Sequence, residues 1–484
     1  MTLDPALNYF PETIRHIHLM GICGTGVGAL AGMLKSAGFV VTGSDQQVYP
    51  PMSDFLAQEG IPVQSGYSPA NLTPRPDLVV VGNVIRRDNP EALALAELGL
   101  PYASFPQALG HFFIGAKKSL VVTGTHGKTT TSSLLATLLH GAGLAPSFMI
   151  GGLVQAFGRN FNVAGGEYFV AEGDEYDTAF FDKGPKFLHY RPHVAIVTSI
   201  EFDHADIYAD LEAIKSSFRK LVAIMPPAGC LVACLDDPVV RELVAAAPCP
   251  VLGYGSAPDA LWRLDGLRVE PGGTTFVAMK KGQPFGSFLN VLPGRHNALN
   301  ALAVIAVLDF LGVGQEAIAS GLRAFQGVRR RQEVRGVVRG VTVIDDFAHH
   351  PTAVRETLAA LAAAYAGKRL VAVFEPRTNS SRRRVFQEAY ADSFAGAAEV
   401  LVREPMPLAN VPAHEQFSSR QLVDDLLARG ISARYFPSTE AILAHLVSTA
   451  GGGDVVAIMS NGGFDNIHQR LLALLAGAGQ GGNA

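Results

Sequence analysis

Cysteine, tryptophan and charged residues are scarce in this chain. Its 484 residues include 4 cysteines and 1 tryptophan, and charged residues make up 17%. The cysteines form no C-x-x-C pair, which argues against a zinc site and a disulfide framework, so we expect reduced thiols at Cys23, Cys230, Cys234 and Cys249. The formal net charge of -4 provides no basic field, so no nucleic-acid partner is expected.

Long apolar segments are also missing. The longest apolar helix that the pattern predicts, residues 298–313, carries Asn300 and Asp309 and is shorter than a membrane span. Residues 1–15 mix acidic, amide and proline residues and contain no apolar core of a signal peptide. We therefore expect no membrane insertion and a cytoplasmic location.

Strand and helix patterns alternate in three successive blocks. A hydrophobic content of 48% is ample for buried parallel strands, and a chain of this length is too long for one core. We predict an α/β protein of three domains with mostly parallel sheets, which are residues 1–116 (Rossmann-like), 117–327 (P-loop) and 328–484 (Rossmann-like). Residues 229–290 are rich in Gly and Pro and are predicted to form an irregular insertion in the middle block.

A phosphate-binding loop is predicted at residues 121–130. Val121 and Val122 end a buried strand, Gly124 and Gly127 allow the backbone to wrap around an anion, and a helix follows at 132–140. Lys128 would reach the β- and γ-phosphates, and the Thr129 hydroxyl would bind Mg²⁺. Because Val122 stands where the general pattern has its first glycine, the loop is a shortened variant; an ordinary Gly-rich turn is the alternative.

A second glycine loop lies upstream. Gly24, Gly26 and Ala29 fit the pattern G-x-G-x-x-G/A after an apolar strand, and the next strand ends at Asp45, near the spacing expected for a ribose contact. The same geometry accepts NAD or any nucleotide with a diphosphate-sugar, and it also occurs in turns that bind no ligand.

Acidic residues follow two further strands. Glu172 ends a strand and begins the run E-G-D-E-Y-D, and Asp203-His204 follows another strand end. Mg²⁺ takes few protein ligands and keeps several waters, so Thr129, Glu172 and His204 are the predicted ligands. Alternatively, such acids only cap the helices that follow.

Five motifs resemble, in this order, those of the Mur ligases of bacterial cell-wall synthesis: G-T-H-G-K-T-T (124–130), E-G-D-E (172–175), D-H (203–204), G-R-H-N-A-L-N (294–300) and D-D-F-A-H-H-P (345–351). The resemblance covers nearly the whole chain. Within the family, four segments are more similar to ligases that join UDP-N-acetylmuramate to the tripeptide L-Ala-γ-D-Glu-meso-diaminopimelate, recovered from old cell wall. They are residues 175–183, 201–207, E-P-R-T-N (375–379) and S-N-G-G-F (460–464). The D-D-x-x-H-H-P run is shared with the ligases that add L-alanine, which is the alternative function.

The resemblance implies ATP and Mg²⁺, an acyl-phosphate intermediate and three domains, for the UDP-sugar, for ATP and for the amine substrate. The implied catalytic residues are Lys128, Glu172, His204, Asp346 and His349. The implied ATP-binding residues are Gly124, Thr125, His126, Gly127, Lys128, Thr129, Thr130, Asn297, Asn300, Arg331 and Asp346. The implied UDP-sugar-binding residues are Gly24, Thr25, Gly26, Ser44 and Asp45, and Arg377 is implied for the peptide.

Some positions depart from the family or have a simpler explanation. Relatives that carry a carbamylated lysine after the D-x-H motif have it where this chain has Phe218, so no carbamate is predicted. His349 and His350 either belong to the site or only cap the helix after Pro351. Arg377 either binds a substrate carboxylate or lies in a solvated loop.

Two other functions use only part of these motifs. A nicotinamide-dependent oxidoreductase would use the first glycine loop and Asp45, but it leaves the phosphate loop and the 297–300 helix unexplained. A nucleotide-controlled binding protein would use ATP as a switch, without ligase chemistry.

Overall fold

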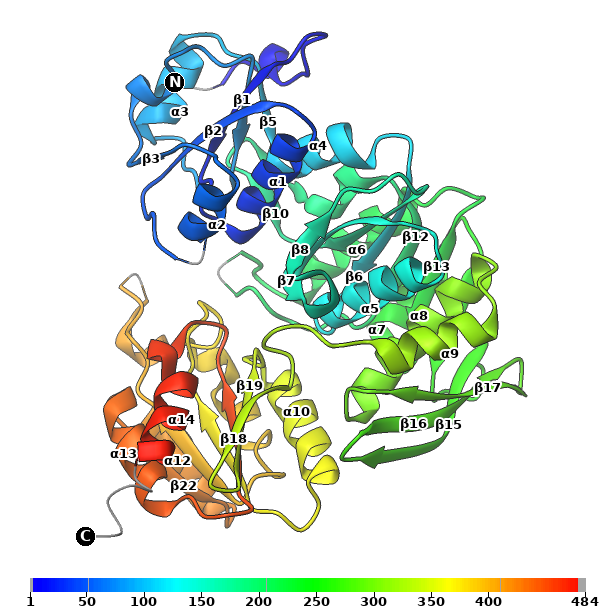
Figure 1. The fold of residues 1–484 in the computed structure, drawn as a ribbon, viewed down its shortest axis with the longest axis vertical. Coiled ribbons are helices and arrows are strands. Elements are labelled where there is room, and N and C mark those ends of the chain that lie inside the picture. Colours follow the sequence, from blue (N-terminus) through cyan, green and yellow to red (C-terminus); the bar gives the residue numbers. More distant parts are fainter. Residues whose placement is uncertain (1–2, 51, 206, 410, 478–484) are drawn as a thin grey trace. The chain divides into compact units, whose positions relative to one another are not determined.

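The computed structural model describes residues 3–50, 52–205, 207–409 and 411–477, which belong to two compact units (Figure 1). The first unit comprises Met1–Ile200, Leu211–Ala260 and Ala303–Gly321, and the second comprises Glu201–Asp210, Leu261–Leu302 and Leu322–Ala484. The predicted α/β class with mostly parallel sheets is confirmed.

A five-stranded parallel sheet opens the first unit, in the order β3-β2-β1-β4-β5. Its strands are β1 (His16–Met20), β2 (Val40–Asp45), β3 (Val63–Ser65), β4 (Leu78–Val81) and β5 (Tyr102–Ser104), with helices α1 (Thr25–Ser36), α2 (Met52–Gln58), α3 (Pro90–Glu97) and α4 (Phe105–Leu109). The strand order reverses between β1 and β4, and ligands of such sheets bind at the carboxyl ends of the strands at that point.

A second parallel sheet of this unit runs in the order β14-β13-β12-β6-β9-β7, with β8 antiparallel at its edge. Its strands are β6 (Lys118–Thr123), β7 (Ser147–Val154), β8 (Arg159–Asn162), β9 (Tyr168–Gly173), β12 (Pro192–Val197), β13 (Cys230–Cys234) and β14 (Val251–Gly255). Helices α5 (Lys128–Gly141), α6 (Leu211–Ala223) and α7 (Pro238–Val244) and the hairpin β10 (Asp177–Ala179) and β11 (Asp182–Pro185) complete this part. Helices α8 (Arg295–Phe310) and α9 (Gln315–Ala324) have residues in both units.

The prediction of an irregular insertion at 229–290 is wrong. Strands β13 and β14 belong to the parallel sheet, and β15 (Trp262–Glu270), β16 (Gly273–Lys280) and β17 (Gln283–Asn290) pair as antiparallel neighbours in the second unit. Gly272 and Gly282 mark tight turns between regular strands, and Lys281 (φ +51°) and Gly282 (φ +76°) both have the positive φ of a two-residue hairpin turn. Trp262 is fully buried, with the ring of Phe285 4.9 Å away.

The second unit also contains a six-stranded sheet in the order β18-β19-β23-β20-β21-β22, parallel except for β18. Its strands are β18 (Glu333–Val338), β19 (Val341–Asp346), β20 (Leu370–Phe374), β21 (Glu399–Arg403), β22 (Ser432–Phe436) and β23 (Val455–Met459). Its helices are α10 (Pro351–Ala364), α11 (Gln387–Ala391), α12 (Ser419–Ala428), α13 (Thr439–Thr449) and α14 (Ile467–Gly477). Apolar clusters cover both faces, which buries the sheet as parallel strands require.

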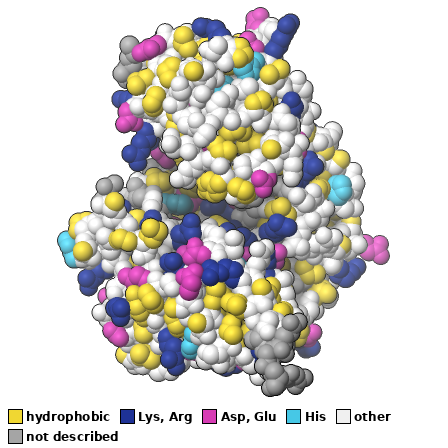
Figure 2. Space-filling model, turned by 60° about the vertical axis from the view of Figure 1, so that its left-hand side comes forward, with side chains coloured by type: hydrophobic (Ala, Val, Ile, Leu, Met, Phe, Trp, Pro, Cys, Tyr) yellow, Lys and Arg dark blue, Asp and Glu magenta, His cyan; other side chains and the backbone are white. Residues whose placement is uncertain are grey.

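Charged side chains of both signs lie on the surface of the protein. Basic and acidic side chains are interspersed on the face drawn in Figure 2, with hydrophobic side chains between them. Within the part of the chain that the structure describes, every helix is too short or too polar to cross a bilayer.

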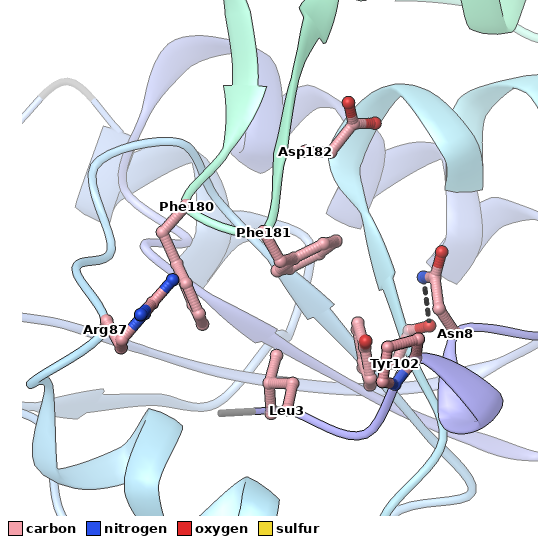
Figure 3. A pocket seen from close by; sticks show the side chains of 8 residues that line it. Leu3, Asn8, Arg87, Tyr102, Phe180, Phe181 and Asp182 are labelled. Atoms are coloured by element: carbon pink, nitrogen blue, oxygen red, sulfur yellow. Dashed lines mark hydrogen bonds between the residues drawn. The ribbon is translucent and has the colours of Figure 1, made fainter. Parts of the chain in front are cut away.

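A cavity of about 330 Å³ lies in the first unit, beside the turn of the β10–β11 hairpin (Figure 3). Phe181 at that turn packs edge-on against Tyr102, with ring centroids 4.8 Å apart. The polar groups of this cavity serve the fold, since Asn8 donates to the Tyr102 carbonyl and Asp182 pairs with His189. These contacts point to a packing role for the hairpin.

A buried polar network joins β1, β2 and α3 in the first unit. The carboxylate of Glu91 lies 2.7 Å from His18 Nε2, and it accepts hydrogen bonds from Ser44 Oγ (2.8 Å) and Asn71 Nδ2 (2.8 Å). Both His18 and Glu91 are fully buried. Burial alone would raise the pKa of Glu91, but the hydrogen bonds and the charge of His18 outweigh it and lower the pKa.

We predict that Glu91→Gln destabilises the five-stranded sheet by about 3 kcal/mol, because the amide offers hydrogen atoms where the carboxylate accepts. Since the folded-state pKa lies below the ordinary value of 4.5, the contribution of Glu91 is full above that pH and is lost as the pH falls. Hydrogen exchange of the β1 and α3 amides, measured between pH 4 and 7, reads the local opening free energy. Glu97→Gln, an exposed position of the same helix, is the control, and equal protection in both variants would contradict the prediction.

Candidate active site

The predicted phosphate loop joins β6 to α5 as expected. Gly124 (φ +125°) and Gly127 (φ +80°) both have left-handed backbones, and Gly127 is the N-cap, so α5 begins at Lys128 and not at the predicted 132. A Cβ on Gly124 would lie 2.2 Å from Thr198 Oγ1, so no other residue fits there. The loop therefore presents the start of a long helix, where N–H groups lack helical partners, at the end of a buried strand.

The loop is braced against the residues after β12. Thr125 N–H donates to the Ser199 carbonyl (2.7 Å) and His126 N–H to Ser199 Oγ (3.3 Å), while Thr198 Oγ1 donates to the His126 carbonyl (2.6 Å). These two backbone amides hold the shape of the loop. The first turn of α5, which includes Thr129 and Thr130, remains the part predicted to face the phosphates.

Lys128 is the charged centre of the loop. Its ammonium group donates to the Gly124 carbonyl (2.7 Å) and to Glu175 Oε2 (3.1 Å). Burial would lower the pKa of Lys128, but Glu175, Asp174 and Glu172 outweigh it and raise the pKa, so the lysine stays charged. The side chain is therefore held ready as a cation beside the helix start.

Lys186 is a partner of this centre that the sequence analysis missed. Lys186 Nζ lies 2.9 Å from Asp174 Oδ2 and 4.0 Å from the ring centroid of Tyr176. Burial raises the pKa of Asp174, but Lys186 and Lys128 outweigh it and bring the pKa to about 2. The E-G-D-E-Y-D run signalled the acids, but nothing in the sequence around Lys186 connects it with them.

Thr129 and Glu172 provide oxygen ligands close together. Thr129 Oγ1 donates to Glu172 Oε2 (3.3 Å), and Gly151 N–H donates to Glu172 Oε1 (2.7 Å). A hydroxyl and a carboxylate suit Mg²⁺, a hard cation that prefers oxygen. Both residues lie in the first unit, whereas His204 lies in the second, so the third ligand stays a prediction.

Phe218 fills the position considered for a carbamylated lysine. Its side chain on α6 is fully buried, and its ring centroid lies 5.7 Å from that of Phe187. An apolar contact of this kind leaves no room for a charged group. Phe218 therefore has a packing role at this position.

The first glycine loop is tied down by Asp45. Gly24 is the N-cap of α1, which makes Thr25 the first residue of that helix, and Asp45 Oδ2 accepts from Cys23 N–H (2.9 Å). Ser44 is fully buried and donates to Glu91, so its hydroxyl supports the fold beneath the loop. A role for these residues in UDP-sugar binding stays a prediction.

Acidic and histidine side chains gather in the second unit. Burial raises the pKa of Asp203, but His204, His349 and His350 outweigh it and bring the pKa to about 2. His350 is the N-cap of α10, because its Nδ1 accepts from Thr352 N–H (3.3 Å) while Nε2 lies 3.2 Å from the Phe202 carbonyl. His350 therefore caps α10, and its membership of the site stays a prediction.

Gln332 forms hydrogen bonds with both Asp346 and Asn297. Asp346 accepts from Gln332 N–H (2.8 Å), and Asn297 Nδ2 donates to Gln332 Oε1 (3.0 Å). Burial raises the pKa of Asp346, although Arg331 acts in the opposite direction. Gln332 is a further residue of this group that sequence reasoning missed; Asn300 Nδ2 lies 3.5 Å from Asn297 Oδ1.

Arg377 follows β20 at the carboxyl edge of the six-stranded sheet. Its side chain is 53% exposed, and Nη1 lies 3.9 Å from Glu375 Oε2. The buried Glu375 also accepts from Ser460 Oγ (2.6 Å), which follows the neighbouring strand β23. A guanidinium fork is thus available to an anion at this edge.

The run Arg382–Arg384 lies mostly outside helical structure. Arg382 donates to the Met406 carbonyl (3.0 Å), and only Arg384 belongs to a short 3₁₀ helix, Arg384–Phe386. The side chains of Arg382 and Arg384 connect loops of the second unit.

Known proteins resemble the chain along its length. Residues 16–116 match the family description "Mur ligase family, catalytic domain", residues 122–308 match "Mur ligase middle domain" and residues 329–462 match "Mur ligase, glutamate ligase domain". A UDP-N-acetylmuramate–L-alanyl-γ-D-glutamyl-meso-2,6-diaminoheptandioate ligase of Escherichia coli (strain K12) is 39% identical over 466 residues, which cover 95% of this chain and 98% of the relative. A UDP-N-acetylmuramate–L-alanine ligase of Arthrobacter sp. (strain FB24) is 39% identical over 447 residues, which cover 92% and 91%.

Two solved structures share the fold. A murein peptide ligase from Psychrobacter arcticus 273-4 has a TM-score of 0.71 and 35% identity, over 96% of this chain and 99% of that one. A UDP-N-acetylmuramate-alanine ligase from Thermotoga maritima has a TM-score of 0.78 and 25% identity, over 96% and 100%.

We predict that Lys128→Ala slows ATP-dependent phosphate release roughly a hundredfold, which corresponds to a rise of about 3 kcal/mol in activation free energy. The reason is that one preorganised cation beside the phosphoryl group is lost. A phosphate-release assay measures the rate. Lys118→Ala, whose side chain is 48% exposed at the start of β6, is the control. Near-normal turnover of a folded Lys128→Ala protein would remove this lysine from the chemistry.

Proposed function

We propose a substrate pair for this chain. The chain belongs to the Mur ligase family and is an ATP-dependent, amide-bond-forming ligase. The chain joins the lactyl carboxylate of UDP-N-acetylmuramate to the amino group of L-Ala-γ-D-Glu-meso-diaminopimelate. This is the pair in the name of the E. coli relative. The family resemblance of the motifs implies a peptide recovered from old cell wall.

The observation that carries this choice is the guanidinium of Arg377 beside Glu375 and Ser460. Two curated relatives, one of each kind, are 39% identical to the chain, whereas the solved murein peptide ligase is 35% identical and the solved L-alanine ligase 25%. The tripeptide brings several carboxylates, and an exposed arginine fork at the sheet edge suits such a group. Free L-alanine carries a single carboxylate and has less to gain from an additional anion site.

The chemistry needs positioning and charge neutralisation. An oxygen of the lactyl carboxylate attacks the γ-phosphorus of ATP, and the bond to ADP breaks. Lys128 and the first turn of α5 neutralise the migrating phosphoryl group, and Thr129 and Glu172 would hold Mg²⁺, which supplies further positive charge to the phosphates.

The second step forms the amide. The peptide nitrogen attacks the acyl carbon, inorganic phosphate leaves with its bridging oxygen, and the nitrogen loses a proton. His349 is the candidate acceptor, because Nδ1 lies 3.0 Å from the Phe347 carbonyl, and a proton donated there leaves the lone pair on Nε2. No covalent bond to the enzyme is required, and the motifs of the chain include no evident Ser or Cys nucleophile.

Each domain would have one substrate in this proposal. Residues 1–116 bind the UDP-sugar, residues 117–327 bind ATP and residues 328–484 bind the peptide. For Asn297, Asn300, Arg331 and Asp346, a role in ATP binding stays the prediction that the family resemblance implies. A cytoplasmic location fits the proposal, because ATP and UDP-sugars are made there.

Gly26→Val should raise the KM for UDP-N-acetylmuramate about tenfold, because a β-branched side chain blocks approach to the backbone of the first loop. A Cβ at Gly26 would already lie 3.4 Å from the Phe105 ring. The KM for ATP should stay unchanged, and NAD should not compete. Calorimetry that detects tight NAD binding would favour the oxidoreductase alternative.

Arg377→Lys should lower kcat/KM for the tripeptide by the equivalent of about 2 kcal/mol, because a lysine cannot form the bidentate contact with a carboxylate. Steady-state kinetics with the tripeptide and with L-Ala, L-Ser and Gly measure the effect. The wild type itself should prefer the tripeptide in kcat/KM, since the added residues supply binding energy.

Arg355→Lys is the matched control, because Arg355 is 54% exposed on α10 and its nearest acid is Glu356. Should the wild type prefer L-Ala, the amine assignment fails and the L-alanine ligase alternative replaces it.

A further inference from the structure

The loop that follows β23 is locked to the loop that follows β20. Ser460 Oγ donates to the buried carboxylate of Glu375 (2.6 Å), and Glu375 N–H donates to the Met459 carbonyl (3.1 Å). Gly462 N–H in turn donates to Ser460 Oγ (2.9 Å). The backbone from Met459 to Gly462 is thereby fixed with respect to the strand end that carries Arg377.

Arg330 holds the same loop from the side of β19. Its Nη2 donates to the carbonyls of Ser460 (2.5 Å) and Gly462 (2.6 Å). Asp345 Oδ1 lies 3.5 Å from Arg330 Nε, and the guanidinium lies 5.1 Å from the ring centroid of Phe347. A planar group that bonds two carbonyls at once fixes both of them, so Gly462 has little freedom to move.

The side chain of Arg377 packs directly against Gly462. A Cβ added to Gly462 would be 2.2 Å from both Cδ and Nε of Arg377 and 2.5 Å from its Cζ. The φ of Gly462 is outside the left-handed region, so its backbone does not demand glycine. Glycine leaves open the space that the arginine side chain occupies, and a Cβ there would displace that side chain.

We infer that Gly462 is a positioning residue, which together with Arg330 places the guanidinium of Arg377 for a carboxylate of the incoming peptide. The inference rests on the proposed function and deepens it, because it names the residue that orients Arg377 toward a carboxylate of the peptide. Arg377 alone is poorly constrained, since it is half exposed and its ion pair with Glu375 is long, at 3.9 Å. Contact with the fixed backbone of Gly462 lowers the entropy that the side chain loses when it binds.

The test is Gly462→Ala in the full-length protein, compared with Gly463→Ala. Gly463 is the matched control because it is adjacent and exposed, its φ is -72°, and a Cβ there would meet no atom within 4 Å. We expect Gly462→Ala to raise the KM for L-Ala-γ-D-Glu-meso-diaminopimelate about tenfold, while kcat and the KM for ATP change less than about twofold. Gly463→Ala should match the wild type in all of these parameters.

A second variant separates positioning from a general effect on the fold. In an Arg377→Ala background, Gly462→Ala should raise the KM no further, because the side chain with which it collides is gone. Equal effects of Gly462→Ala in both backgrounds would overturn the inference. So would a wild-type KM in the Gly462→Ala protein.

Failure of the proposed function has a different signature. A wild type that turns over L-Ala in preference to the tripeptide overturns both the amine assignment and this inference. A wild type that prefers the tripeptide, combined with an unaffected Gly462→Ala variant, overturns the inference alone.

Discussion

Parallel strand pairing decides where chemistry can take place in this chain. Thr123 of β6 is the partner of Gly173 of β9, so the phosphate loop and the acids from Asp174 onwards leave their sheet side by side. In the six-stranded sheet, Met459 is the partner of both Asp346 and Phe374, which brings three loops to one edge. An antiparallel arrangement would send alternate loops to opposite edges, and these side chains could not meet.

The charges at the phosphate loop are compensated within the protein. Lys128 and Lys186 are each within hydrogen-bond distance of an acid, Glu175 and Asp174 respectively, and all four are largely removed from water. Separating such a pair would leave a buried charge without its partner, at a cost of several kcal/mol. A nucleotide bound as proposed would therefore enter a site whose charge state is already set, and Lys128 would exchange Glu175 for a phosphate group.

Local patterns predicted the elements well, and contacts between distant segments escaped them. The strand, turn and helix around Gly124 and Gly127 could be read directly, because those glycines are required by positive φ. Glycine at 229–290 was misread as irregularity because it marks tight turns equally well. The Glu91 network and the pairing of Lys186 with Asp174 could not be foreseen, since their members come together only when separate strands and helices pack.

The single tryptophan makes the fluorescence of this enzyme sensitive to one part of its structure. Trp262 is fully buried in β15, Lys280 Nζ lies 5.3 Å from its ring centroid, and its indole N–H has no hydrogen-bond partner among the described residues. Its emission should therefore lie toward the blue end of the tryptophan range, and it should report on the β15–β17 strands of the second unit. A fluorescence melt would follow the loss of those strands and stay largely silent on the five-stranded sheet, so a tryptophan placed there would give each part its own signal.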